Sequence, residues 1–204
     1  MSFYVRCVKQ PIDQIFAVLL ILIFSPLILM VIVVQFVLYA ESIFFLQVRH
    51  TKSRREFKLI KFRTMREAWD INGYLLPDHN RLTKFGRFLR NTKIDELPNL
   101  LNVVRGDLSL VGPRPLPIKY AQLMSKQQLN RYNLQSGLTG LAQISGGNNL
   151  SWSEKLKMDI DYIEKCSFLT DLKIIFRTFK IIFKAQKLTD FDHKSFDDYK
   201  PNFN

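Results

Sequence analysis

Residues 15–40 read IFAVLLILIFSPLILMVIVVQFVLYA, and only Ser25, Pro26 and Gln35 interrupt the apolar character of this run. About 20 apolar residues are enough to cross a bilayer, whereas the apolar part of a signal peptide has roughly 7–15. No small-residue cleavage site follows the run. It is also too long and too continuously apolar for an ordinary buried core helix. We therefore predict a helix inserted in a membrane.

Pro26 divides this predicted helix near its middle. Proline lacks an amide hydrogen and clashes with the preceding turn, so the helix should bend there, and the Ser25 hydroxyl can bond a freed carbonyl group. The arms 15–25 and 26–40 would measure about 16 and 22 Å, each shorter than a hydrocarbon core of about 30 Å. The chain can cross the bilayer as one kinked helix, or turn back at the break and leave by the same face. Composition alone does not choose between these topologies.

The chain as a whole is basic. Its 204 residues carry 30 Lys and Arg against 18 Asp and Glu, a net charge of +12. Before the apolar run, Arg6, Lys9 and Asp13 give only +1, whereas residues 49–93 hold 13 Lys and Arg against 4 Asp and Glu. This excess predicts anionic partners, and the positive-inside tendency places the main body in the cytoplasm. With only two cysteines, the chain fits a reducing compartment.

Acidic and basic residues meet in the basic segment. Residues 57–63 should form a short strand, and Lys84, Arg87 and Arg90 recur at helical spacing just before Asp95-Glu96. Phosphate chemistry requires cations that hold the phosphates beside a carboxylate that attacks or binds a metal. A solvated helix face is the commoner meaning of a charge run, so the spacing alone leaves both interpretations open.

Two further patterns indicate ligand or membrane contact. Pro113 and Pro115 stiffen the backbone around Arg114, which presents the guanidinium with less entropy to lose, although an ordinary loop is equally compatible. Near the C-terminus, five cations recur at spacings of 4, 3, 4 and 3, typical of an amphipathic helix lying on anionic headgroups. They are Lys173, Arg177, Lys180, Lys184 and Lys187.

Taken in order, the motifs resemble those of a known family. They are the Ser25-Pro26 break, FFLQVR at 44–49, KFRTM at 61–65, LTKFGRFLR at 82–90, DELPNL at 95–100, GDLSLVGPRP at 106–115, GLTGLAQ at 137–143 and the stretch from Trp152 to Leu172. Each is commonplace, but the ordered set covers nearly the whole chain and is specific. The chain resembles the bacterial sugar transferases, in particular the small monotopic phosphoglycosyl transferases.

The resemblance implies an activity. Members transfer a sugar 1-phosphate from a UDP-sugar to undecaprenyl phosphate and release UMP, the first membrane step of glycoconjugate or polysaccharide assembly. In the family scheme an aspartate forms a phosphosugar-enzyme intermediate, so Asp95 is the expected nucleophile and metal ligand, and Glu96 its catalytic partner. Mg²⁺ is the expected cofactor. The expected substrate-binding residues are Lys61, Arg63, Arg90, Pro113, Arg114, Pro115 and Gln143.

The resemblance also implies an architecture, a mostly helical α/β protein. Residues 1–41 are expected to form a re-entrant membrane helix broken at Ser25 and Pro26. Residues 42–188 are expected to form a small catalytic domain with amphipathic interfacial helices, on the cytoplasmic face of the bacterial inner membrane and in contact with anionic lipids. Residues 189–204 are expected to be a poorly ordered tail. No oligomeric state is predicted.

Two other functions compete with this prediction. A catalytically silent membrane adaptor on the same scaffold is compatible with Gly147, which stands where many members have an arginine. The intact Asp95 and Glu96 favour an active enzyme instead. A membrane-tethered nucleic-acid binder is compatible with the basic pI alone, but no DNA-binding motif or aromatic-interleaved strand supports it, so we expect no nucleic-acid partner.

Overall fold

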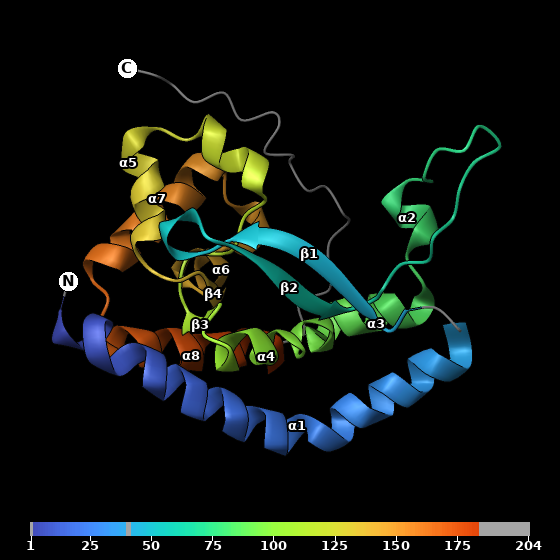
Figure 1. Cartoon of the computed structure of the whole chain (residues 1–204), viewed down its shortest axis with the longest axis horizontal. Coiled ribbons are helices and arrows are strands. Elements are labelled where there is room, and N and C mark those ends of the chain that lie inside the picture. The colour runs from blue at the N-terminus through green and yellow to red at the C-terminus, as the bar shows by residue number, and fades with distance from the viewer. Residues whose placement is uncertain (1, 40–41, 184–204) are drawn as a thin grey trace.

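The computed structural model of the chain describes residues 2–39 and 42–183. Within these ranges the protein is mostly helical, with one antiparallel hairpin and one parallel pair of strands, which confirms the predicted class. The main elements are α1 (Lys9–Tyr39), β1 (Phe44–His50), β2 (Glu56–Phe62), α2 (Asp78–Arg81), α3 (Lys84–Thr92), α4 (Asn99–Val104), β3 (Ser109–Val111), α5 (Lys126–Leu129), β4 (Gly137–Thr139), α6 (Leu141–Ser145), α7 (Trp152–Glu164) and α8 (Phe168–Phe183). Helix α1 runs along one edge of the molecule, and the other elements lie on its concave side (Figure 1).

Helix α1 continues through Pro26 and bends near its middle (Figure 1). Because Pro26 has no amide hydrogen, the carbonyl group of Leu22 loses its usual helical partner. The Ser25 hydroxyl donates a hydrogen bond to that carbonyl oxygen over 2.8 Å. The predicted bend and the predicted role of Ser25 are both confirmed.

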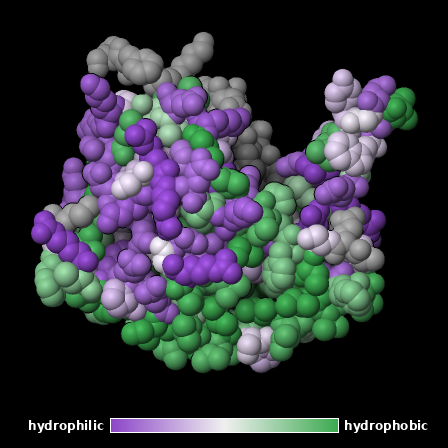
Figure 2. Space-filling model, in the orientation of Figure 1, coloured by the Kyte–Doolittle hydropathy of each residue, from purple (hydrophilic) through white to green (hydrophobic). Residues whose placement is uncertain are grey.

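Only the two arms of α1 are buried against the rest of the protein. Its buried residues are Lys9, Asp13, Ala17, Val31 and Gln35, and none lies in the central turns. Large apolar side chains such as Leu22, Ile23 and Leu29 are exposed there. Figure 2 shows a continuous hydrophobic surface along this edge. By length and composition α1 could cross a membrane.

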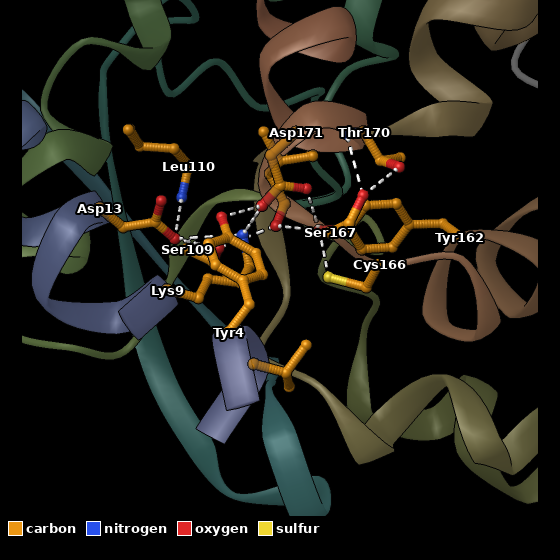
Figure 3. A network of polar contacts seen from close by, with 12 residues as sticks. Tyr4, Lys9, Asp13, Ser109, Leu110, Tyr162, Cys166, Ser167, Thr170 and Asp171 are labelled. Carbon is orange, nitrogen blue, oxygen red and sulfur yellow. Dashed lines mark hydrogen bonds and ion pairs between the residues drawn. The ribbon is translucent and has the colours of Figure 1, made fainter. Parts of the chain in front are cut away.

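A buried polar network holds the first arm of α1 (Figure 3). Lys9 Nζ lies 2.5 Å from Asp171 on α8 and 3.3 Å from Asp13. Asp13 also accepts a hydrogen bond from the Ser109 hydroxyl on β3, and Asp171 accepts one from the Tyr162 hydroxyl on α7. The count of charges before the apolar run treated Lys9 and Asp13 as exposed at the membrane interface. In the structure both are buried inside the protein. They are buried because each finds an ionic or hydrogen-bond partner in the domain.

The second arm of α1 packs on the hairpin and on α3. Val31 lies in one hydrophobic cluster with Phe62 and Leu89, and the Gln35 side-chain amide donates a hydrogen bond of 2.6 Å to the carbonyl oxygen of Arg63. The same domain thus holds both arms of the helix.

Strands β1 and β2 pair in antiparallel register, which confirms the strand expected at residues 57–63 to within one residue. Arg49 lies opposite Phe57, and Phe45 lies opposite Lys61. Side chains alternate between the faces of a sheet, so Arg49 and Lys61 belong to one face and Lys58 to the other.

Helix α8 confirms the helix predicted near the C-terminus. Lys173, Arg177 and Lys180 are exposed on it, beside exposed apolar residues such as Phe176. Lys184, Lys187 and the predicted tail lie outside the described residues. The helix therefore presents both a basic and an apolar surface beside the start of α1 (Figure 1).

Gly86 places α3 directly on the backbone that follows β2. A Cβ atom at this position would lie 2.0 Å from the carbonyl oxygen of Thr64. We expect Gly86→Ala to lower the free energy of unfolding by about 1–3 kcal/mol, because α3 or the Thr64 segment must shift. Thermal denaturation would measure this, with Asn91→Ala at an exposed position of α3 as the control. Equal melting temperatures for Gly86→Ala and the wild type would contradict this packing.

Candidate active site

Asp95 and Glu96 lie in a short 3-10 helix, Ile94–Glu96, between α3 and α4. Lys93 adopts a left-handed conformation with φ 60°, which ends α3 and turns the chain into this segment. Asp95 is buried, with 7% of its surface exposed, and Glu96 is half-buried. A short, tightly wound segment thus holds two adjacent carboxylates.

Two cations hold Glu96. Lys61 Nζ lies 2.6 Å from Glu96 Oε1, and Arg114 Nη2 lies 3.7 Å from the same oxygen. Burial by itself would raise the pKa of Glu96, but the charges of Lys61 and Arg114 lower it to about 2. Glu96 therefore stays ionised and orients both cations.

The pKa of Asp95 is shifted in the opposite direction. Burial, together with the charge of Glu96, raises the pKa of Asp95 to about 6, against the attraction of Lys61, Lys93 and Arg90. Among the described residues, no group donates a hydrogen bond to Asp95 Oδ1, which is buried. Buried polar atoms without a hydrogen-bond partner are unusual in folded proteins. The two adjacent carboxylates thus lie in different environments, and their pKa values are shifted in opposite directions.

An open pocket adjoins Glu96. Its lining residues are Arg49, Leu59, Lys61, Glu96, Asn99, Leu108, Arg114, Pro115, Gly137 and Leu138. The fold gathers them from the hairpin, from α4 and from the ends of β3 and β4. Three cations and one carboxylate line the pocket, and such an excess of positive charge suits an anionic ligand.

Of the remaining predicted site residues, Arg90 lies near Asp95, and Pro113 and Pro115 flank Arg114, whereas two others do not line this pocket. Arg90 interacts electrostatically with Asp95, and its Nε donates a hydrogen bond of 2.9 Å to the Thr64 hydroxyl. Pro113 is buried and Pro115 half-buried, on either side of exposed Arg114. Arg63 and Gln143 do not line the pocket at Glu96.

Arg63 lines a second pocket at the end of α1, with Gln35 and Tyr39 among its neighbours. Its Nη1 lies 3.1 Å from Glu67. Gln143 lies on α6, and neither polar atom of its buried amide has a hydrogen-bond partner among the described residues. The expected substrate-binding roles of these two residues stay predictions.

Arg49 and Asn99 line the pocket but were not predicted as site residues. Arg49 shares a sheet face with Lys61, which the hairpin register makes visible. Asn99 follows Glu96 by three residues, the spacing that brings side chains to one side of a helical segment. Both signals depend on knowing the pairing of the strands and the continuation of the helical turns beyond Glu96.

Comparisons with known proteins identify the family of this chain. The profile of the family described as "Bacterial sugar transferase" matches residues 4–185. The chain is 43% identical over 185 residues to the "Uncharacterized sugar transferase EpsL" of Bacillus subtilis, covering 91% of this chain and 92% of that protein. It is 35% identical over 187 residues to the "Exopolysaccharide production protein ExoY" of Sinorhizobium fredii, covering 83% of each.

A relative from Caulobacter vibrioides is named for its reaction. This "UDP-glucose:undecaprenyl-phosphate glucose-1-phosphate transferase" is 37% identical over 180 residues, covering 83% of this chain and 67% of that protein. These likenesses confirm the family that the ordered motifs predicted. The chain belongs to the bacterial sugar transferase family and is an enzyme of the transferase class.

Proposed function

We propose that this protein transfers a sugar 1-phosphate from a UDP-sugar to undecaprenyl phosphate and releases UMP, at the cytoplasmic face of the bacterial inner membrane. The observation that carries the proposal is the pairing of Glu96 with Lys61 and Arg114 beside a buried Asp95 with an unpaired oxygen. The name of the Caulobacter vibrioides relative states the same class of reaction.

In the proposed mechanism Asp95 is the nucleophile. Its carboxylate oxygen bonds to the sugar-bearing phosphorus of the donor, the bond from that phosphorus to the bridging oxygen breaks, and the electron pair leaves with UMP. A phosphate oxygen of the polyprenol acceptor then attacks the same phosphorus and frees Asp95. Lys61, Arg90 and Arg114 offset the charge of the reacting phosphates, while Glu96 keeps Lys61 and Arg114 in position.

Mg²⁺ is the proposed cofactor, with Asp95 as its protein ligand. No cluster of three or more Asp, Glu, His or Cys suited to a metal occurs within residues 2–39 and 42–183. Mg²⁺ needs no such cluster, because it commonly binds one or two carboxylates together with substrate phosphates. The unpaired Asp95 Oδ1 fits this requirement. When bound, the ion would neutralise charge on the phosphates.

Release of UMP tests the proposed activity. Purified protein in lipid nanodiscs is incubated with a panel of UDP-sugars, with and without undecaprenyl phosphate. We expect sustained UMP release with both substrates, at most one UMP per enzyme with the donor alone, and loss of activity in EDTA. A catalytically silent adaptor would release no UMP with any donor, and that result would refute the proposal.

We further propose that α1 is re-entrant. Its first arm contacts β3 and α8 through Asp13 and Lys9, and its second arm contacts β2 and α3 through Gln35 and Val31. A helix that crossed the bilayer would carry one arm away from a domain confined to one face. Contact of both arms with one domain instead favours a helix that enters and leaves by the same face, with the bend at Pro26 inside the bilayer.

Cysteine labelling tests this topology. In a background with Cys7 and Cys166 replaced, we expect a cysteine at Ser2 to stay protected from an impermeant thiol reagent in intact cells, because the N-terminus stays in the cytoplasm. Replacing Ser25 and Pro26 with Ala and Leu should straighten α1 and expose that cysteine. Permeabilised cells provide the positive control. Labelling of the parent in intact cells would exclude a re-entrant helix.

A further inference from the structure

Arg49 lines the pocket beside Glu96, and part of its guanidinium group is buried without hydrogen-bond partners. Its Nη2 donates a hydrogen bond of 2.5 Å to the side-chain oxygen of Gln47. Its Nε and Nη1 are buried and have no hydrogen-bond partner among the described residues. Burying charged donors without partners is costly, so the position of this side chain calls for an explanation.

The charges around Arg49 increase that cost. Burial, together with the charge of Arg114, lowers the pKa of Arg49 to about 10. Glu96, the carboxylate that lines the same pocket, is already paired with Lys61 and Arg114. The two guanidinium groups therefore share a pocket whose single carboxylate is paired with Lys61 and Arg114 and not with Arg49.

A structural arginine in the same protein looks different. Arg131 is buried, with 1% of its surface exposed, and two of its nitrogens bond Asp159 at 3.0 and 2.7 Å. It also donates a hydrogen bond of 2.6 Å to the carbonyl oxygen of Arg114. Within residues 2–39 and 42–183, Arg131 thus has a carboxylate partner and only its Nη1 is buried without a hydrogen bond, whereas Arg49 has no carboxylate partner and both its Nε and its Nη1 are buried without one.

We propose that Arg49 and Arg114 bind the phosphate that leaves with the nucleotide, an inference that rests on the proposed function. Asp95 attacks the sugar-bearing phosphorus and does not line this pocket, whereas Arg49 and Arg114 do. The second phosphate of the donor then extends into the pocket. Negative charge develops on it as the bond to the sugar-bearing phosphorus breaks. The planar forks of two guanidinium groups suit a phosphate dianion.

Ligand-induced thermal stabilisation of the full-length protein tests this inference without turnover. The probes are UDP and inorganic pyrophosphate, and the variants are Arg49→Gln, Arg49→Lys and Lys58→Gln. Lys58 is exposed on the opposite face of the same hairpin and serves as the matched control. We expect the dissociation constant for UDP to rise about 10- to 100-fold in Arg49→Gln, less in Arg49→Lys and under about twofold in the control.

Melting without ligand separates binding from structure. If Arg49 serves a ligand, Arg49→Gln removes an unpaired buried charge, and the free variant should melt no lower than the wild type. A lower melting temperature with unchanged UDP affinity would make Arg49 a structural residue and overturn the inference. Failure of the wild type to bind either probe would also overturn it.

The outcomes also separate this inference from the proposed function. Wild-type UMP release with equal UDP affinity in Arg49→Gln would refute only the role of Arg49. Arg49-dependent binding of pyrophosphate without UMP release from any UDP-sugar would support the anion site and refute the proposed reaction.

Discussion

Asp95→Asn is expected to lower the rate of UMP release by about 10³-fold or more and to prevent formation of a phosphosugar-enzyme intermediate. The asparagine amide has nearly the same shape as the carboxylate, so it should fill the same buried position. The amide, however, cannot act as the nucleophile. UMP release and mass spectrometry of the protein after incubation with donor would measure both effects. Membrane attachment should not change, because none of the groups that shift the pKa of Asp95 lies on α1.

A neighbouring variant and a control sharpen this test. Glu96→Gln should reduce turnover by about 10²-fold, because Lys61 and Arg114 lose the charge that orients them. Asp161→Asn, on α7 and outside the pocket, should retain activity. Near wild-type UMP release by Asp95→Asn would show that another group receives the phosphosugar.

Lys9→Gln is expected to lower the free energy of unfolding by about 3–5 kcal/mol, the usual cost of leaving a buried charge without its partner. Lys9 lies between Asp13 and Asp171, which are 5% and 4% exposed, so its loss leaves two buried carboxylates without a cation. Thermal or chemical denaturation in detergent measures the effect. Arg6→Gln removes an exposed charge one turn earlier and is the matched control.

A second substitution checks the cause. Combining Lys9→Gln with Asp171→Asn removes one of the uncompensated charges, so the double variant should be more stable than the sum of the single effects predicts. Strict additivity would show that the two residues do not interact. Because Asp13 also bonds Ser109 on β3, and β3 leads into the Pro113-Arg114-Pro115 segment, we expect loss of this network to reduce activity as well.

The two adjacent carboxylates show how one short segment can place neighbouring groups in different environments. Glu96 contacts two cations and stays charged, whereas Asp95 is buried with one oxygen unpaired. The difference arises from the groups that surround each side chain. Adjacent sequence positions alone would have suggested two equivalent, mutually repelling groups.

The sequence by itself determined the apolar helix, its bend at Pro26, the strand at β2 and the helices α3 and α8. Each of these depends on local composition, side-chain periodicity or a residue's own backbone restrictions, which a linear sequence displays directly. The Asp95-Glu96 pair was found for a similar reason, since its motif is contiguous. Its family was predicted because several such motifs follow one another in a specific order.

Only the tertiary structure decided which charges neighbour which carboxylates. Lys61 reaches Glu96 across 35 positions of sequence, and Lys9 reaches Asp171 across 162. The tertiary structure also determines that Lys9 is buried, that Arg49 lines the pocket at Glu96 and that Arg63 lies at the end of α1. Electrostatic energy depends on distance and burial in three dimensions, and neither can be computed from the order of residues until the chain has folded.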